Sequence, residues 1–520
     1  MGYRGGCLVL SKIYSCVLNG LDGNLIEVEV DISNGLPALT IVGLPDTAVK
    51  ESKERIRAAI KNSGFEFPMK RITINLAPAN TKKEGTHLDL PMALGIMDAA
   101  GQIENEKIRD FAFIGELSLN GKLNRIAGVL PLVIALKNSG FRKIILPEAN
   151  AEEGAIVQDA EIYPFSNLND IIRYLKGELT LSPLQGGKSI HNDKNNRDLE
   201  DFDDVVGQES IKRAFQIAAA GGHNLLMIGP PGSGKTMLAR RFPSILPDMT
   251  YEEALEVTKI YSVAGLLTDQ SSLITKRPFR SPHHTISSIA LVGGGRVPKP
   301  GEVSLAHYGV LFLDELPEFQ RNVLEVLRQP LEDEVVTISR INGTLTYPSK
   351  FILVASMNPC PCGYYGDAVH PCSCTFPQIK KYLSKISGPL LDRIDIHVEV
   401  FPVKYTELQG EHRTKDTEQL KIAVEHARKI QIERYKNEGI FFNSQLKPKL
   451  LKKYCKLGSS EKALLEEAFH KLGLSARAYN RIIKLSRTIA DLSGSDQILV
   501  SHIAEAIQYR NLDKKFWNMQ

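Results

Sequence analysis

Residues 1–178 combine two hydrophobic patterns. Apolar and polar residues alternate, as in half-buried strands, in four runs: 26–32, 71–77, 111–119 and 143–147. Apolar residues recur at helical spacing in 46–64 and 128–140, and each run ends in glycine, a residue typical of helix C-termini. The two patterns together predict an α+β domain.

A polar, charged stretch interrupts this pattern, and we interpret 179–200 as a linker. Beyond it, short apolar runs alternate with helical segments and predict strands of a parallel sheet covered by helices: 224–229, 309–314, 350–356 and 394–400. Only helical spacing remains in the last part of the chain. We therefore predict a multidomain α/β protein, with an α/β core over 201–405 and a small helical domain over 406–520.

The composition changes this picture little. The chain has 520 residues, 43% of them hydrophobic, and its net charge of +4 neither requires nor excludes a nucleic-acid partner. No apolar run approaches the roughly 18 residues of a membrane-spanning helix, so no membrane association is expected. Cys7, Cys16 and Cys455 are scattered rather than paired in a disulfide framework, which favours a reducing cytoplasm.

The strongest motif is the glycine-rich run 229-GPPGSGKT-236, which follows an apolar strand and precedes a helix. Glycines let backbone N–H groups wrap phosphate oxygens, a lysine reaches the β- and γ-phosphates, and a hydroxyl binds Mg²⁺. The motif predicts an ATP site formed by Gly229, Pro230, Pro231, Gly232, Ser233, Gly234, Lys235 and Thr236.

A second apolar strand, 310-VLFL-313, ends in two acidic residues. Strands of a parallel sheet end at the same edge, so these acids are expected near the phosphates. Asp314 is then a candidate Mg²⁺ ligand, together with Thr236. Glu315 is the candidate that orients and polarises the attacking water.

Two Cys-x-Cys pairs, Cys360/Cys362 and Cys372/Cys374, form the other notable pattern. Four thiolates suit tetrahedral Zn²⁺, and a closed set of four ligands leaves no open position for catalysis. Free buried thiols or a redox pair are the alternatives, and His370 could replace one thiol. We favour a structural zinc site.

Residues 201–510 resemble an AAA+ ATPase of the magnesium-chelatase-like branch, with 204-DVVGQ-208 resembling the lead-in segment that packs near the adenine. By this resemblance, Asn358 occupies the sensor-1 position, 390-LLDRIDI-396 carries the arginine finger Arg393, and Arg477 is the sensor-2 arginine of a helical lid. The resemblance implies ATP, Mg²⁺ and a homohexameric ring, in which Arg393 reaches the neighbouring subunit's nucleotide.

Two segments resemble the loops that line the central pore in this branch. The first, 276–300, contains basic residues and no acid; the second, 335–351, predicts a hairpin at Asn342-Gly343. Positive charge on such loops suits a DNA backbone that threads the ring. The candidate DNA contacts are Arg296, Lys299, Arg340 and Asn342. Alternatively, the basic residues form a solvated face or meet acids of a neighbouring subunit.

Residues 1–178 resemble the proteolytic domain of Lon-type proteases, which has the ribosomal S5 domain 2-like fold, most clearly in 110–150. However, His87 stands where the family has its nucleophilic serine, and Leu132 stands where it has its lysine base. Because a serine nucleophile needs a neighbouring base, the resemblance implies that the fold is kept and the protease activity lost.

Both halves together resemble the YifB/ComM family, notably in 281-SPHHTIS-287, 312-FLDELPEF-319 and 357-MNPCPCGYYG-366. This resemblance implies an ATP-dependent DNA helicase that promotes branch migration of incoming DNA in natural transformation, with single-stranded and branched DNA and recombination proteins as partners. Two other functions remain open: a magnesium-chelatase motor subunit and an ATP-dependent Lon-like protease.

Overall fold

The computed structural model describes most of the chain: residues 10–103, 106–187, 200–267, 273–295, 298–340, 343–367, 369–403, 416–472, 474–510, 512 and 516–517. The chain divides into two compact units, Met1–Asn192 with Tyr251–Thr275, and Asp193–Thr250 with Lys276–Gln520. The domain boundaries expected from the sequence stay predictions, and the one at 405 lies outside the described residues.

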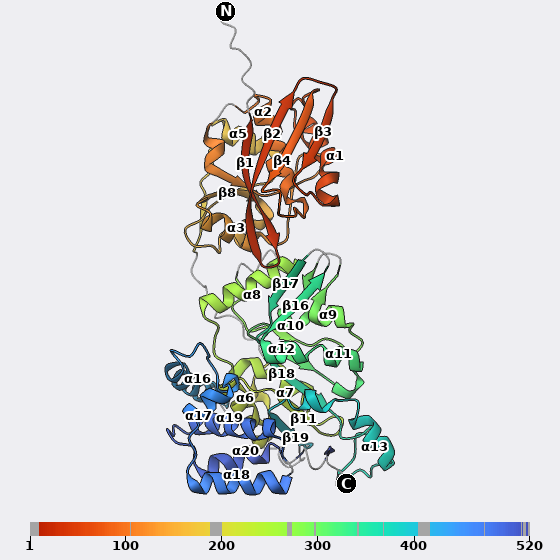
Figure 1. Ribbon diagram of the computed structural model, residues 1–520, viewed down its shortest axis with the longest axis vertical. Helices are drawn as coiled ribbons and strands as arrows, with labels where there is room; N and C mark the ends of the chain where they lie inside the picture. The colour runs from red at the N-terminus through yellow and green to blue at the C-terminus, as the bar shows by residue number, and fades with distance from the viewer. Residues whose placement is uncertain are drawn as a thin grey trace, which may run out of the picture. The chain divides into compact units, whose positions relative to one another are not determined.

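The first unit is built on an eight-stranded sheet of order β10-β9-β8-β5-β1-β2-β4-β3 (Figure 1). Its strands are β1 Ser11–Asn19, β2 Asp22–Ser33, β3 Ala38–Val42, β4 Arg71–Ala77, β5 Phe111–Phe113, β8 Lys143–Pro147, β9 Glu161–Phe165 and β10 Leu184–Gln185. The predicted strands at 26–32, 71–77 and 143–147 are confirmed. The run 111–119 is divided between β5 and a short strand β6, Glu116–Leu117, which pairs with β7, Leu123–Asn124.

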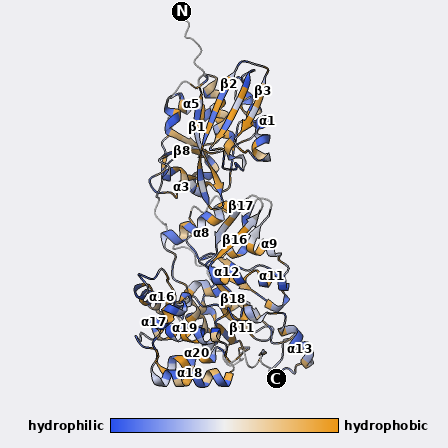
Figure 2. Cartoon of the chain, viewed as in Figure 1, coloured by the Kyte–Doolittle hydropathy of each residue, from blue (hydrophilic) through white to orange (hydrophobic). Residues whose placement is uncertain are grey.

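Both faces of this sheet are covered, because alternate residues of the strands enter two separate cores. Ile13 and Val17 of β1 pack with α1 (Thr47–Asn62), α2 (Asp89–Ala99) and α5 (Leu168–Leu175), whereas Cys16 packs with α3 (Val129–Asn138). Hydrophobic and hydrophilic residues both occur along these strands (Figure 2). The sequence pattern predicted α1 and α3, and the structure confirms both.

Helix α2 is the main element that the hydrophobic pattern does not reveal. All nine residues from Asp89 to Met97 are buried. A helix that is apolar on every side lacks the periodic change from apolar to polar on which prediction depends.

The first unit includes a segment that follows the P-loop helix in the sequence. Helix α8 (Tyr251–Ala264) packs against α3. Its Ser262 hydroxyl donates to the Glu153 carboxylate at 2.5 Å, and its Tyr251 hydroxyl donates to the Ile156 carbonyl at 3.0 Å. The contacts of this segment therefore belong to the N-terminal unit, although the sequence pattern assigns it to the α/β core.

The second unit contains the predicted parallel sheet, with the order β12-β15-β18-β11-β19. Its strands are β11 Leu225–Ile228, β12 Phe279–Arg280, β15 Val310–Leu313, β18 Ile352–Met357 and β19 Ile396–Glu399, and every neighbouring pair is parallel. Every residue of β11, β15 and β18 is buried, as expected for a sheet covered on both faces. Helix α6 (Glu209–Gly221) precedes β11, and α7 (Lys235–Arg241) follows it.

Five helices between residues 416 and 508 form one group in Figure 1. They are α16 Asp416–Arg434, α17 Pro448–Tyr454, α18 Ser459–Leu472, α19 Ala476–Leu492 and α20 Val500–Gln508. Three of them were predicted from helical spacing; α17 and α20 are shorter and were not. Among the described helices, none has both the length and the apolarity that crossing a membrane requires.

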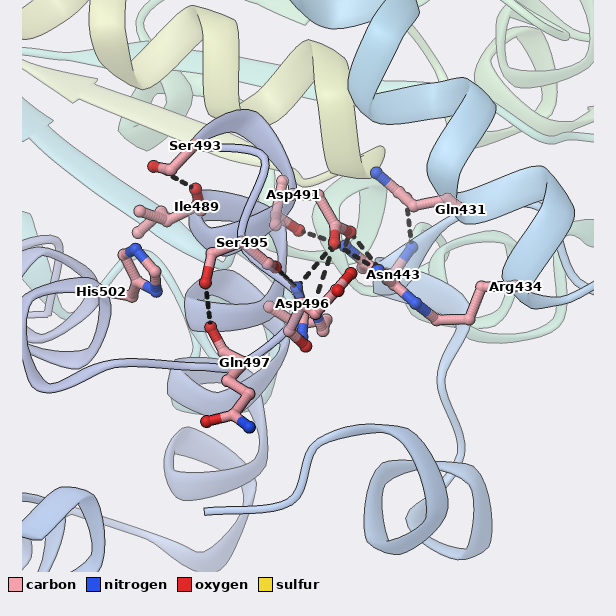
Figure 3. A network of polar contacts seen from close by, with 12 residues as sticks. Gln431, Arg434, Asn443, Ile489, Asp491, Ser493, Ser495, Asp496, Gln497 and His502 are labelled. Atoms are coloured by element: carbon pink, nitrogen blue, oxygen red, sulfur yellow. Dashed lines mark hydrogen bonds and ion pairs between the residues drawn. The ribbon is translucent and has the colours of Figure 1, made fainter. Parts of the chain in front are cut away.

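A buried polar network holds three of these C-terminal elements together (Figure 3). The Asp491 carboxylate of α19 is fully buried and accepts from both Arg434 Nη atoms at 2.6 and 2.9 Å, from Arg487 Nε at 3.0 Å and from Asn443 Nδ2 at 2.8 Å. One carboxylate therefore neutralises the buried guanidinium of Arg487 and the half-buried one of Arg434, and the network links α16, α19 and the turn between α16 and α17.

We expect Asp491→Ala to reduce the free energy of unfolding by roughly 3–5 kcal/mol, because it leaves one buried and one half-buried cation without their anion. The loss should appear as faster hydrogen exchange of the α19 amides in mild urea. Asp496→Ala is the matched control, because Asp496 is exposed and contacts Arg487 through its backbone carbonyl. Equal exchange rates in the two variants would contradict this role of Asp491.

Candidate nucleotide site

The glycine-rich run forms the turn between β11 and α7. Gly232 and Gly234 have φ angles of +75° and +87°, in the left-handed region that glycine adopts without strain. Nothing lies within 4 Å of a Cβ built on Gly232, so the backbone conformation alone requires glycine there. A loop of this conformation before a helix N-terminus presents backbone N–H groups to an anion.

Lys235 lies inside this loop and points toward the end of β18. Its Nζ donates to the Gly229 and Pro230 carbonyls at 2.7 and 2.8 Å and to Asn358 Oδ1 at 3.2 Å. Burial lowers the pKa of the Lys235 ammonium to about 8, although the carboxylates of Asp314 and Glu315 act in the opposite direction. Lys235 and Asn358, 123 residues apart in sequence, therefore meet at one site.

The candidate magnesium ligands lie side by side. Thr236 Oγ1 donates to Asp314 Oδ2 at 2.7 Å, and the Ser356 hydroxyl donates to the other oxygen of the same carboxylate. A hydroxyl beside a carboxylate is a donor set that Mg²⁺ accepts, so the residues fit the ion.

Glu315 follows Asp314 in an unusual backbone conformation. Its φ of +54° is rare for a residue with a side chain, and its N–H donates to Ser356 Oγ at 3.3 Å. Its side chain is exposed beside the loop. A strained, non-glycine residue at the end of a buried strand is typical of a functional position.

Arg393 lies at the opposite edge of the same sheet. Its carbonyl accepts from Asn224 Nδ2 at 2.9 Å, and Asn224 comes directly before β11, whereas the P-loop comes directly after it. Because β11 has four residues, the two edges are roughly 13 Å apart. The Arg393 guanidinium is buried; it pairs with Glu332 of α12 (Arg328–Asp333) and donates to the Pro389 carbonyl at 2.5 Å.

A cavity of about 510 Å³ opens at this edge, and Arg393 and Arg477 both line it. Arg477 lies in the first turn of α19 and is largely exposed, with Nη1 at 3.9 Å from Asp392. The P-loop residues are not among those that line the cavity. The structure thus brings the two arginines together, away from the P-loop of their own chain.

Three further residues at this edge were not singled out from the sequence. Asp395 accepts from Arg481 Nε at 3.0 Å and from His223 Nδ1 at 2.8 Å, and His223 Nε2 lies 2.8 Å from the Thr488 hydroxyl of α19. Burial disfavours the Asp395 carboxylate, but His223 and Arg481 outweigh it and hold its pKa well below the usual range. No local sequence pattern indicates that these residues interact, because they are far apart in the chain and only the fold brings them together.

The four predicted cysteines form one cluster. Their sulfur atoms all lie within 4.8 Å of one another, the set can hold a metal ion, and none of the four is in a disulfide. Burial raises the pKa of the Cys360 thiol to about 12, whereas at Cys362 backbone N–H groups outweigh burial and lower the pKa to about 5. His370 is exposed and is not part of this cluster.

Only some of the candidate DNA-contact residues lie within the part of the chain that the structure describes. The predicted hairpin is confirmed as β16 (Val335–Arg340) and β17 (Gly343–Pro348), with Arg340 paired to Gly343. Arg296 and Asn342 lie outside the described residues, as does the side chain of Arg340. Lys299 is exposed on β14 (Lys299–Pro300).

The basic segment 276–300 packs closely on this hairpin. A Cβ on Gly293 would lie 2.6 Å from the Lys299 carbonyl oxygen and 3.1 Å from Ile338 of β16. Two arginines of segment 276–300 form hydrogen bonds or ion pairs within the protein. Arg280 pairs with both oxygens of Glu302, and Arg277 donates to backbone carbonyls.

In the first unit, the positions that correspond to a Lon-type nucleophile and base are both buried. His87 is 6% exposed and Leu132 is fully buried. His87 Nε2 donates to the Cys16 carbonyl at 3.0 Å, and burial lowers the pKa of its imidazole to about 4. At this position the chain has a neutral, hydrogen-bonded histidine rather than an accessible nucleophile.

We expect acid to destabilise the first unit through His87. The pKa of His87 falls from about 6.5 in the unfolded chain to about 4 in the folded chain. The contribution of the neutral histidine to the free energy of unfolding is therefore fully present above pH 6.5 and is lost as the pH falls toward 4. At pH 5 the loss is about 2 kcal/mol. Hydrogen exchange of β1 and α2 amides at pH 7 and pH 5, corrected for intrinsic rates, measures it.

His87→Gln is the comparison variant, because glutamine can donate to the same carbonyl and does not titrate. In this variant, the corrected exchange rates of the β1 and α2 amides should differ much less between pH 7 and pH 5 than in the wild type. An unchanged pH dependence would show that another group is responsible.

Family models match all three regions of the chain. The model described as magnesium chelatase, subunit ChlI, matches residues 201–408; that of subunit ChlI of Mg-chelatase matches 28–150; and that of the ChlI C-terminal region matches 414–510. The competence protein ComM of Haemophilus influenzae is 45% identical over 509 residues, which cover 96% of this chain and 97% of that protein. This chain belongs to the YifB/ComM family.

Other relatives agree with this family assignment. YifB of Escherichia coli strain K12 is 43% identical over 517 residues, which cover 98% of this chain and 99% of YifB. Lon protease 2 of Syntrophobacter fumaroxidans is similar over a shorter region, with 27% identity over 179 residues that cover 32% of this chain and 22% of the protease. This chain thus combines a magnesium-chelatase-like AAA+ region with a partial similarity to Lon.

Proposed function

We propose that this member of the YifB/ComM family is an ATP-driven, hexameric DNA translocase that promotes branch migration of incoming DNA. The family's magnesium-chelatase-like AAA+ region supports ATP hydrolysis. The name of the Haemophilus relative, a competence protein, supports a role in DNA uptake and recombination.

One observation supports a ring-shaped assembly: the two groups of candidate catalytic residues lie at opposite edges of one sheet. Lys235, Thr236 and Asp314 gather at one edge, while Arg393 and Arg477 line a cavity at the other. An arginine roughly 13 Å across the sheet from its own P-loop is better placed to serve a neighbour. Head-to-tail contacts of this kind form a ring when the rotation between neighbouring subunits closes.

The residues of each site would divide the work of hydrolysis. The P-loop N–H groups and Lys235 would bind the phosphates, and Thr236 and Asp314 would hold Mg²⁺, which neutralises phosphate charge when bound. Glu315 would orient the attacking water, and Asn358 would sense the γ-phosphate through its contact with Lys235. Arg393 and Arg477 of the neighbouring subunit would stabilise the negative charge that develops as the phosphate leaves.

The pore-facing loops are our candidates for DNA contact. Segment 276–300 and the β16–β17 hairpin pack on each other, and Lys299 presents an exposed positive charge there. Phosphate contacts by such residues would make binding dependent on salt and independent of sequence. Arg296, Arg340 and Asn342 are proposed for the same role.

The N-terminal unit is proposed to keep a Lon-like fold without protease activity. A serine–lysine pair is missing, and the buried His87 cannot replace it as an accessible nucleophile. The helical segment is proposed to act as the lid of the AAA+ module, and the four cysteines to hold a structural Zn²⁺.

The decisive experiment measures three properties of the purified full-length protein: ring formation by light scattering, ATP turnover, and migration of a synthetic branched DNA. We expect rings in the presence of an ATP analogue, stimulation of ATP turnover by single-stranded and branched DNA, and ATP-dependent branch migration. Lys235→Ala, which removes the phosphate-binding ammonium, is the inactive control. A protein that stays monomeric and hydrolyses ATP at a rate independent of DNA would refute the proposal.

A chelatase motor subunit is the second candidate, because the matching family models carry that description. The same turnover assay distinguishes it. Stimulation by a porphyrin and Mg²⁺ but not by DNA would favour the chelatase function. Casein degradation, measured in parallel, tests the remaining alternative of a Lon-like protease.

A further inference from the structure

The cysteine cluster has the dimensions of a tetrahedral zinc site. Cys360 Sγ lies 3.3 Å from Cys362 Sγ and 3.6 Å from Cys372 Sγ, and the last two sulfurs are 3.5 Å apart. Zinc–sulfur bonds of about 2.3 Å place tetrahedral sulfurs roughly 3.8 Å apart. The three distances are a few tenths of an ångström shorter than this, so a small outward shift of the sulfurs around an ion would reach that arrangement.

The backbone around the cluster supports the sulfur atoms. The Cys362 N–H donates to Cys374 Sγ at 3.4 Å, and the Cys374 N–H donates to Cys372 Sγ at 3.4 Å. Hydrogen bonds of this kind stabilise thiolates and fix the orientation of ligands around a metal. Each Cys-x-Cys pair therefore forms a turn that directs both of its sulfurs inward.

The first of these turns contacts the nucleotide loop. Gly363 has a φ of +89°, and a Cβ built on it would lie 2.5 Å from Pro231 Cδ and 2.8 Å from Pro231 Cγ. Pro231 belongs to the P-loop, between β11 and Gly232. Backbone of the cysteine loop thus packs directly against the P-loop, with no room for a side chain between them.

The cluster is also joined to the sheet and to a neighbouring helix. Cys360 comes two residues after Asn358, which accepts from Lys235 Nζ. Cys374 comes directly before Thr375, the N-cap of α13 (Phe376–Leu383), whose Ile379, Tyr382 and Leu383 are buried. An ion bound by the four sulfurs would therefore tie together the end of β18, the loop against Pro231 and the start of α13.

We propose that a zinc ion in the Cys360–Cys374 cluster sets the position of the P-loop, so that nucleotide affinity depends on the bound metal. The ion is not catalytic, since four thiolates leave it no open position. Without it, the cysteine loop loses its cross-link and no longer supports Pro231, and the P-loop gains alternative conformations. This inference deepens the proposed function and rests on its nucleotide site.

The test compares metal content and nucleotide affinity in the full-length protein. Plasma mass spectrometry should find about one zinc ion per chain. Removal of zinc with a zinc-selective chelator, followed by restoration of Mg²⁺, should weaken binding of a fluorescent ADP analogue by roughly tenfold. Added ZnCl₂ should restore the affinity. Cys372→Ser should behave like the chelated protein, whereas Cys455→Ser, at a buried cysteine outside the cluster, should not.

Gly363→Ala separates the contact from the metal. This variant keeps all four sulfurs and should still bind zinc, but its methyl group would displace Pro231 and weaken nucleotide binding. Gly439→Ala is the matched control, because Gly439 has a similar left-handed φ of +67° and nothing within 4 Å of its Cβ position. Circular dichroism would confirm that both variants are folded.

Two results would overturn the inference: a native protein with no zinc, for example with disulfides in the cluster, or an affinity unchanged by zinc removal and by Gly363→Ala. A wild-type protein that holds zinc but binds no nucleotide would instead refute the nucleotide site itself, and the inference with it. Tight binding by wild-type and metal-free protein alike would refute only the inference.

Discussion

Arg393→Ala should lower ATP turnover by roughly 10³–10⁵-fold and leave nucleotide binding nearly unchanged, as expected for loss of an arginine finger. The residue lies at the amino edge of the parallel sheet, whereas Lys235 and Asp314 lie at the carboxyl edge. Its guanidinium would therefore act in the site of a neighbouring subunit. Steady-state turnover and fluorescence titration with an ADP analogue measure the two effects separately.

Mixing two inactive variants tests whether the arginine acts between subunits. Lys235→Ala lacks a working P-loop but keeps Arg393, and Arg393→Ala has the converse defect. In rings formed from a one-to-one mixture, about a quarter of the interfaces would combine an intact P-loop with an intact arginine, and activity should reappear. An arginine that served its own chain would give no recovery, because each chain lacks one component.

Glu315→Gln should bind ATP normally and hydrolyse it roughly 10²–10⁴-fold more slowly, the usual cost of losing a group that activates water. Glutamine keeps the size of the side chain but cannot attract the proton of the attacking water. Because the ring would stay in its ATP-bound state, the variant should remain on DNA under conditions in which the wild type dissociates. Single-turnover hydrolysis and filter binding to labelled DNA measure both outcomes.

Glu318→Gln is the matched control for this variant. Glu318 is three residues away, and its exposed carboxylate pairs with Lys385 at 3.2 Å. We expect its turnover to match that of the wild type. Normal turnover in Glu315→Gln as well would assign the activation of water to another residue.

Local patterns were sufficient to predict most of the nucleotide edge. The P-loop, the strand that ends in Asp314 and the strand that ends near Asn358 each carry their own signal within about ten residues. Parallel strands end at a common edge, so the meeting of these segments followed from the sheet type. The contacts of Thr236 with Asp314 and of Lys235 with Asn358 agree with that expectation.

Other features gave no such local signal. Helix α2 is buried on all sides and so shows no periodicity, and α8 packs on the N-terminal unit although its sequence follows the P-loop helix. His223 and Asp395 are 172 residues apart, and nothing in either neighbourhood indicates that they form a pair. Such contacts depend on how whole elements pack, which a window of sequence does not contain.

The sequence by itself determined the parallel sheet and the order in which the motifs follow its strands along the chain. It also determined the chemistry of the residues at the strand ends. These features depend only on periodicity and on residue type. The tertiary structure alone decided that Arg393 and Arg477 line one cavity, away from the P-loop of their own chain. It alone decided that Gly363 lies against Pro231. Distances between segments that are remote in the chain are set by the packing of the core, and a local sequence pattern does not specify that packing.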